Sequence, residues 1–235
     1  MPTATLTTET ATSNSPTIIP LKAGKPSQAT TAATLRSLYN RAARAFLHRD
    51  VAQTHSLLAS AFAIIQPPSS YALDSLAMHR RKWDILRITL ETTIYSSPGD
   101  NEIPSTLRDL LLLPSQSLIK MLHERSLVLF TPTTPSQKPS SAFLPSQVLI
   151  TLILSSMKLD CPVVGRSIIE DWLAWRGQFG ELQEDREGYE KVLDIYCLHV
   201  LPLLEEWDYA REFLQHENEL PQEKRAVCSI GLQFK

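Results

Sequence analysis

Glycine and cysteine are scarce in this sequence of 235 residues, which contains 7 glycines and 3 cysteines. The glycines form neither the G-x-G-x-x-G pattern of dinucleotide-binding folds nor a lysine-containing phosphate loop, and no serine lies in a G-x-S-x-G turn. The cysteines Cys161, Cys197 and Cys228 are widely separated, without a C-x-x-C pair or a recognisable secretory leader. We therefore expect reduced, structural thiols in a cytosolic environment.

Clusters of catalytic or metal-binding side chains are also missing from the sequence. None of the 6 histidines lies in an H-E-x-x-H pattern or pairs with a cysteine at zinc-binding spacing. The acidic pairs Glu170-Asp171 and Glu205-Glu206 are adjacent on predicted helices, and adjacent helical side chains point about 100° apart. We expect no enzyme activity, cofactor, metal ion or small-molecule substrate.

Neither sign of charge dominates, since 23 Lys and Arg residues stand against 25 Asp and Glu residues. A net charge of −2 and a pI near 6.3 give no global basic field that would attract nucleic acid, so we expect no nucleic-acid partner. The longest apolar runs, such as Leu110–Leu113 and Leu149–Leu154, are far shorter than the ~20 residues that span a bilayer. The chain as given is expected to be soluble.

Two segments are too rich in Pro, Ser and Thr to form a hydrophobic core. Residues 1–26 are predicted to be a disordered N-terminal segment. Residues 131–142, TPTTPSQKPSSA, are predicted to be a flexible insertion. The remainder, 27–235, is interpreted as a single helical docking domain that contains this insertion.

A joint between apolar helices recurs along the chain: one helix ends, an aspartate follows, and another apolar helix begins. The joints are expected at Asp50, Asp84, Asp160 and Asp208. Aspartate is a good N-cap, because its carboxylate accepts hydrogen bonds from the free amides of the first helical turn. The first two joints are separated by about the 34-residue period of tetratricopeptide-type repeats, and the later intervals are less regular. The pattern predicts an all-α fold, an irregular tetratricopeptide-like α-solenoid of stacked antiparallel helical hairpins.

The expected helices follow from apolar residues at i, i+3, i+4 and i+7. Their approximate ranges are 27–49, 51–65, 70–83, 84–95, 104–113, 115–130, 145–157, 161–176 and 187–207, with shorter helices from 208 and from 221. Pro202 lies inside one of these ranges and is expected to kink that helix.

A basic cluster beside a tryptophan is the strongest candidate for a protein-binding surface. The candidate residues are Phe46, Leu47, Arg80, Arg81, Lys82 and Trp83. Arginine and tryptophan are favoured as interface anchors, and the Phe-Leu pair before the neighbouring joint is expected to extend the same surface. Each part of this surface also has a structural interpretation. The basic residues would be solvated at the negative, C-terminal end of a helix dipole, and Trp83 would pack between the two helices of its hairpin.

Four stretches of the chain resemble, in this order, the helical hairpins of the peroxin-26 family of tail-anchored peroxisomal membrane proteins. They are ARAFLHRDVAQTHSLLASAF from Ala43, HRRKWDILRITLETTIYSSP from His79, the opening at Leu144-Pro145 with the later IIEDWLAW, and HVLPLLEEWDYAREFL from His199. The resemblance covers roughly residues 35–225.

The resemblance implies a non-catalytic adaptor on the cytosolic face of the peroxisomal membrane. Its helical domain would dock the AAA ATPase peroxin-6, together with peroxin-1, which recycles the import receptor for peroxisomal matrix proteins. Family members carry a C-terminal transmembrane helix, which this sequence, ending at Lys235, does not contain; membrane contact is expected only through such an anchor. The alternative is another α-solenoid scaffold, acting in membrane trafficking or in the delivery of tail-anchored proteins.

Overall fold

A computed structural model of the protein describes residues 28–70, 74–98, 103–134, 138–176 and 185–231. Within these ranges every regular element is a helix, so the expected all-α class is confirmed. The first elements are α1 (Gln28–Leu47), α2 (Val51–Phe62), α3 (Ala77–Ser96), α4 (Ser105–Leu111) and α5 (Ser115–Phe130). They are followed by a 3-10 helix (Ser141–Phe143), α6 (Ser146–Lys158), α7 (Pro162–Arg176), α8 (Arg186–Ile195), a π-helix (Tyr196–Val200), α9 (Leu201–Leu203), α10 (Trp207–His216) and α11 (Gln222–Gly231).

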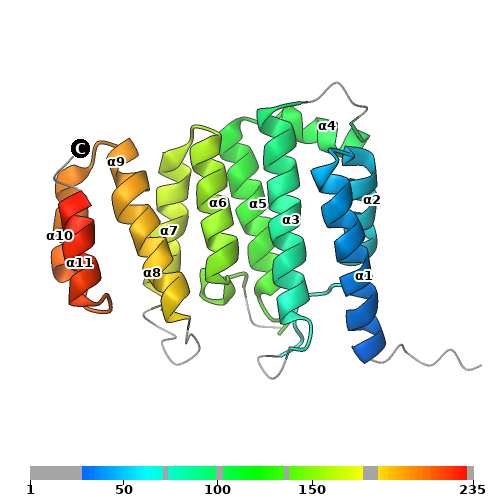
Figure 1. Cartoon of the computed structure of the whole chain (residues 1–235), viewed down its shortest axis with the longest axis horizontal. Coiled ribbons are helices and arrows are strands. Elements are labelled where there is room, and N and C mark those ends of the chain that lie inside the picture. The colour runs from blue at the N-terminus through cyan, green and yellow to red at the C-terminus, as the bar shows by residue number, and fades with distance from the viewer. Residues whose placement is uncertain (1–27, 71–73, 99–102, 135–137, 177–184, 232–235) are drawn as a thin grey trace, which may run out of the picture.

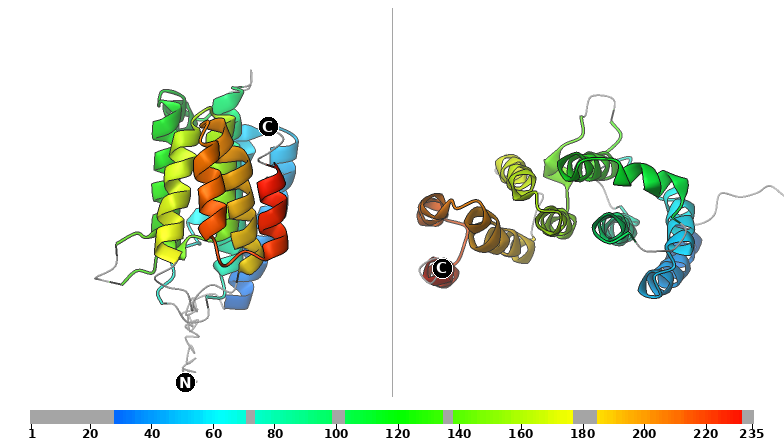
Figure 2. Two further views of the ribbon diagram at one scale, coloured as in Figure 1. Left: turned by 90° about the vertical axis from the view of Figure 1, so that its left-hand side faces the viewer. Right: turned by 90° about the horizontal axis from the view of Figure 1, so that it is seen from above.

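The helices stand side by side in a row and alternate in direction (Figure 1). Viewed from above, α1 and α2 pair at one end of the row and α10 and α11 at the other, while α3 and α6 occupy the middle (Figure 2). The short α4 lies across the upper end of its neighbours (Figure 1). The core runs along the row and includes the fully buried side chains of Trp83, Trp172 and Tyr196.

Three turns on the upper edge of Figure 1 share one backbone geometry: those joining α1 to α2, α6 to α7, and α9 to α10. Each contains a non-glycine residue with positive φ, namely Arg49 at 58°, Asp160 at 54° and Glu205 at 60°. In each, the amide of the next residue donates to the carbonyl five positions earlier, with N···O distances of 2.9, 2.9 and 3.0 Å. This is the Schellman C-cap, which usually has glycine at the left-handed position.

The expected aspartate joints are correct in part. Asp50 caps α2, since its Oδ1 accepts from the Gln53 amide at 2.9 Å. Asp160 lies in the turn before α7 as the left-handed residue. Asp208 is the second residue of α10 and not its N-cap. Glu206 occupies the N-cap position, and its side chain makes no capping hydrogen bond.

The joint expected at Asp84 is wrong, because α3 runs through this position without a break. Asp84 is fully buried, accepts a hydrogen bond from the Ser126 hydroxyl of α5 at 2.7 Å and pairs with Arg87. The apolar stripe of α3 crosses the aspartate, with Trp83 on one side and Leu86 on the other, so the chain gains burial by staying helical. The helix expected from residue 70 begins only at Ala77.

Pro202 lies in the short α9, and the π-helix directly precedes it, so the helical hydrogen bonding changes before the proline; the expected kink itself stays a prediction. Proline lacks an amide hydrogen and its ring collides with the carbonyl four residues earlier; a wider turn relieves this collision.

The insertion at 131–142 is anchored to the helices through its described residues. The Thr133 amide donates to the Pro68 carbonyl at 2.9 Å, and the Ser141 hydroxyl donates to Asp171 of α7. Residues 135–137 and the predicted disordered segment 1–26 lie outside the described residues, so the flexibility of both stays a prediction.

Candidate functional site

The three cations of the basic cluster occupy successive positions near the start of α3 and therefore point in different directions. Arg80 points inward and is 3% exposed. It pairs with Asp74, and its guanidinium donates to the Gln66 carbonyl at 3.1 Å and 2.7 Å. Arg80 thus ties the connection between α2 and α3 to the body of α3 and is not available to a partner.

Trp83 is also a structural residue. Its side chain is fully buried and meets the ring of Tyr39 on α1 edge-on, with ring centroids 5.3 Å apart. The aromatic contact joins α3 to α1, which confirms the core interpretation of this tryptophan. The dipole interpretation of the cluster is wrong, because these cations lie near the N-terminal, positive end of the helix.

Arg81 and Lys82 remain partly or fully exposed but belong to different surroundings. Arg81 lies near Asp185, whose carboxyl pKa is lowered first by a hydrogen bond from the Ser146 hydroxyl and also by this arginine. Lys82 lies near His79, and so does Arg36 of α1. Burial first, and then the charges of Arg36 and Lys82, lower the pKa of His79.

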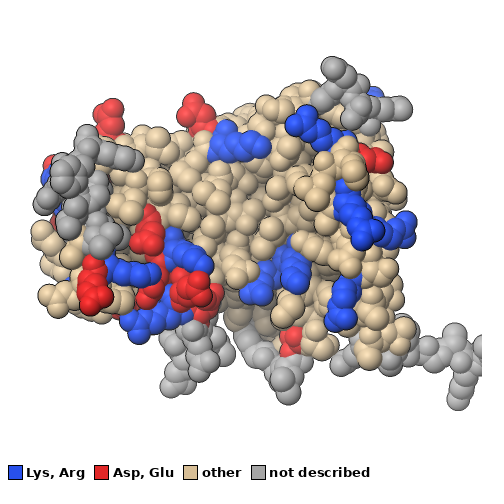
Figure 3. All heavy atoms as spheres, in the orientation of Figure 1, with Lys and Arg blue, Asp and Glu red and all other residues tan. Residues whose placement is uncertain are grey.

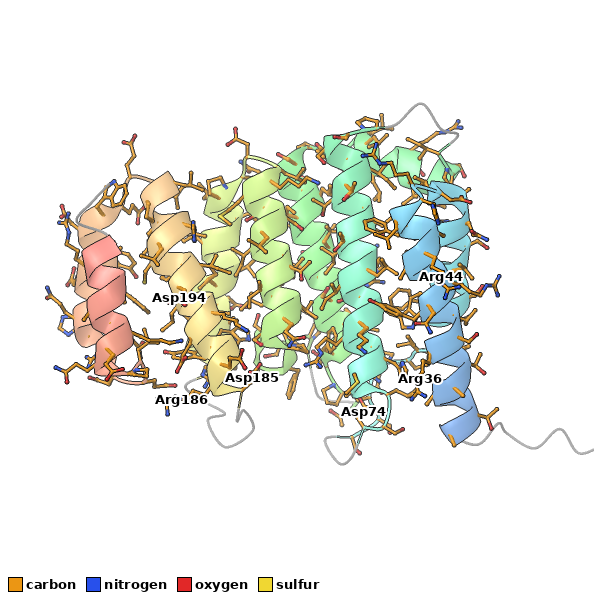
Figure 4. The ribbon with its side chains drawn as sticks, in the orientation of Figure 1. Arg36, Arg44, Asp74, Asp185, Arg186 and Asp194 are labelled. Atoms are coloured by element: carbon orange, nitrogen blue, oxygen red, sulfur yellow. The ribbon has the colours of Figure 1, made fainter. Side chains whose placement is uncertain are left out.

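We call the α1–α3 cationic face the surface formed by Arg36 and Arg44 on α1 and Lys82 on α3; His79 lies beside Arg36 and Lys82, but its lowered pKa favours the neutral imidazole. Arg36 and Arg44 are eight positions apart on one side of α1 and are both exposed (Figure 4). The sequence of α1 contains no acidic residue. Lys and Arg side chains accordingly gather over this end of the molecule, whereas acidic and basic side chains mix at the other end (Figure 3).

Phe46 and Leu47 line a groove of about 670 Å³ at the upper end of the same helices. α3 supplies the opposite wall with Leu90, Thr93, Ile94 and Ser97, which follow i, i+3, i+4 and i+7 spacing and so form one helical stripe. The remaining lining residues are Arg49, Asp50, Val51, Thr54 and Ile103. Leu47 is 78% exposed, so its side chain is accessible at the edge of the groove.

The structure therefore divides the predicted site into two parts. Lys82 precedes Leu90 by eight residues, or about 12 Å along α3, so the cluster does not join the Phe-Leu pair directly. On α1, Arg36 lies near His79 at the lower part, and the exposed Arg44 precedes Leu47 by three positions.

Leu90 and Ile94 border the groove but are buried core residues, as their place in an apolar stripe predicts. Reasoning from the sequence missed the two arginines of α1, which the absence of acidic residues from this helix would have indicated.

The arrangement offers apolar surface bordered by positive charge. In the part of the chain that the structure describes, no three His, Cys, Asp or Glu side chains come together as a metal site. None of the helices described there is both long enough and apolar enough to cross a membrane. Comparison with protein-family models, curated proteins and solved structures gives no match for this chain.

Proposed function

We propose that this chain is the docking domain of a non-catalytic adaptor of the peroxin-26 kind, which recruits the peroxin-1/peroxin-6 AAA ATPase to the cytosolic face of the peroxisomal membrane. The observation that carries the proposal is the groove beside Phe46 and Leu47. Its two walls come from the first two stretches that resemble hairpins of that family, 43–62 and 79–98.

The arrangement of the helices supports a binding role. We infer that the row of antiparallel helices is an irregular α-solenoid, a class of fold that presents extended surfaces to other proteins. The repeated Schellman turn at Arg49, Asp160 and Glu205 is the structural unit of this irregular repeat. Attachment to the membrane would come from the C-terminal transmembrane helix that the resemblance implies.

The proposed contact surface is narrower than the one predicted from the sequence. Leu47 is the exposed apolar anchor, Lys82 and the arginines of α1 supply charge, and the buried Arg80 and Trp83 hold the surface in shape. We expect Arg81 to contribute less to binding, because the nearby Asp185 carboxylate offsets its charge.

Binding of the purified peroxin-1/peroxin-6 complex to the labelled full chain tests the proposal. We expect Leu47→Glu to weaken binding by at least about tenfold, as for an interface anchor, and Lys82→Glu to weaken it less. Leu112→Glu is the matched control, since Leu112 is 82% exposed in another turn on the same edge. Thermal melting should show all three variants folded.

Failure of the wild-type chain to bind the ATPase would contradict the adaptor role. It would favour the alternative of a scaffold protein in membrane trafficking or in tail-anchored protein delivery.

A further inference from the structure

The described residues that line the groove at Phe46 and Leu47 belong to helices and their turns, except Ile103, which lies in irregular chain before α4. Backbone groups inside helices are already hydrogen-bonded to one another, so the groove has no strand edge to which an extended peptide could add. The α3 wall, from Leu90 to Ser97, extends about 10.5 Å, which is close to two helical turns. A surface of this shape accepts another helix, laid against α3 and the corner between α1 and α2.

The lining of the groove is mixed: on the α3 side Leu90 and Ile94 are only 2% and 5% exposed and alternate with Thr93 and Ser97, so most of the accessible apolar surface belongs to the opposite side. Phe46, Leu47, Val51 and Ile103 face the stripe of α3 across it. An amphipathic helix recognised in this way presents apolar side chains at i, i+3 or i+4, and i+7.

The charges around the groove determine which charged residues a partner helix would carry beside its apolar stripe. Arg44 is exposed three positions before Leu47, Arg49 belongs to the lining, and Arg108 donates to the carbonyl of Ile103 at 2.8 Å. Among the lining residues that the structure describes, Asp50 carries the acidic side chain and Arg49 the basic one, so the lining itself is balanced. The positive excess comes from Arg44 and Arg108 beside the groove.

We infer that the groove binds an acidic amphipathic helix of the partner protein, with an apolar stripe about two turns long flanked by Asp and Glu residues. This inference rests on the proposed docking function and specifies the kind of segment that the partner supplies. Charge complementarity along Arg44 and the other cations selects the acidic helix, and the apolar side chains of the lining fix its register.

A designed peptide of about 14 residues is the probe, with leucines at the helical stripe positions and glutamates elsewhere. One matched peptide carries lysine in place of glutamate, and a second carries serine in place of leucine. Fluorescence anisotropy with the full chain should show binding of the acidic peptide that is at least about tenfold tighter than that of either matched peptide. Raised salt should weaken it.

Variants of the protein locate the peptide. Leu47→Glu and Arg44→Glu should each weaken binding of the acidic peptide by about tenfold. Leu112→Glu and Lys120→Glu, which change an exposed leucine and an exposed cation elsewhere, should leave it unchanged. Equal binding of the glutamate and lysine peptides, no binding of the acidic peptide, or insensitivity to Leu47→Glu would overturn the inference.

Parallel titrations with the ATPase separate this inference from the proposed function. ATPase binding that is unaffected by Leu47→Glu and Arg44→Glu would refute the groove as the site and leave the adaptor role standing. Specific binding of the acidic peptide without any binding of the ATPase would refute the adaptor role and leave the groove standing.

Discussion

Substitution of Asp84 by asparagine distinguishes a buried charge from a helix cap. Asp84 is fully buried inside α3, where it accepts a hydrogen bond from Ser126 at 2.7 Å and pairs with Arg87. The side chain of Arg87 is 13% exposed and also lies over the ring of Phe62, 4.2 Å from its centroid. Asparagine keeps the volume and one oxygen acceptor for Ser126 but removes the negative charge.

The expected loss of stability follows from what remains after the substitution. Breaking a buried ion pair by removing one partner costs about 3–5 kcal/mol, because the other charge stays buried without compensation. Because asparagine preserves the hydrogen bond from Ser126, we expect the free energy of unfolding to fall by about 2–4 kcal/mol. For a domain of this size the loss corresponds to a drop in melting temperature of roughly 5–15 °C.

Urea unfolding followed by circular dichroism measures this loss. Asp50→Asn is the matched control, because Asp50 is a true N-cap and asparagine caps helices about as well as aspartate, so the change should stay within about 0.5 kcal/mol. In a double-mutant cycle, the variant that carries Arg87→Met together with Asp84→Asn should regain much of the lost stability, because neither buried charge is then left without its partner. If Asp84→Asn were as neutral as Asp50→Asn, Asp84 would be acting as a cap and the continuous α3 would be wrong.

Three further substitutions test other parts of the structure. Trp83→Ala should lower the free energy of unfolding by about 3–5 kcal/mol in urea titrations, because it empties a core position and removes the contact with Tyr39; a loss under about 1 kcal/mol would place the tryptophan on the surface. Glu205→Gly should raise stability by about 0.5–1 kcal/mol, since relief of the left-handed backbone exceeds the added entropy of the unfolded chain, and destabilisation would contradict the positive φ. Burial lowers the pKa of His123 below 6.5, so the unfolded chain takes up its proton first and stability should fall on acidification below that value. His123→Leu should reduce the difference in melting temperature between about pH 7.5 and about pH 5.5, and an unchanged difference would assign the acid sensitivity to other groups.

The sequence was sufficient to predict most helices, because apolar spacing is a local signal and so are the prolines Pro104, Pro114 and Pro145, each of which immediately precedes a helix. It was insufficient at Asp84, where the motif around Trp83 resembles a joint. Only the partners on α5 and within α3 show that this aspartate is buried and paired.

The candidate site was also predictable only where local sequence signals define it. Phe46 and Leu47 precede a recognisable turn, and their place at a groove follows from that turn. The surroundings of Arg80, Arg81 and Lys82 depend on contacts with residues such as Asp74 and Asp185, and these cations lie near the start of α3, where the sequence analysis expected the end of a helix. Local sequence carries neither kind of information.

Site-specific photocrosslinking tests the central claim most directly. A photoreactive phenylalanine analogue is placed at Leu47 and, as the control, at Leu112, and each full chain is irradiated with the purified peroxin-1/peroxin-6 complex. The account predicts a crosslink to peroxin-6 from position 47 and none from position 112. Equal crosslinking from both positions, or a crosslink from position 112 alone, would contradict the assignment of the groove as the docking site.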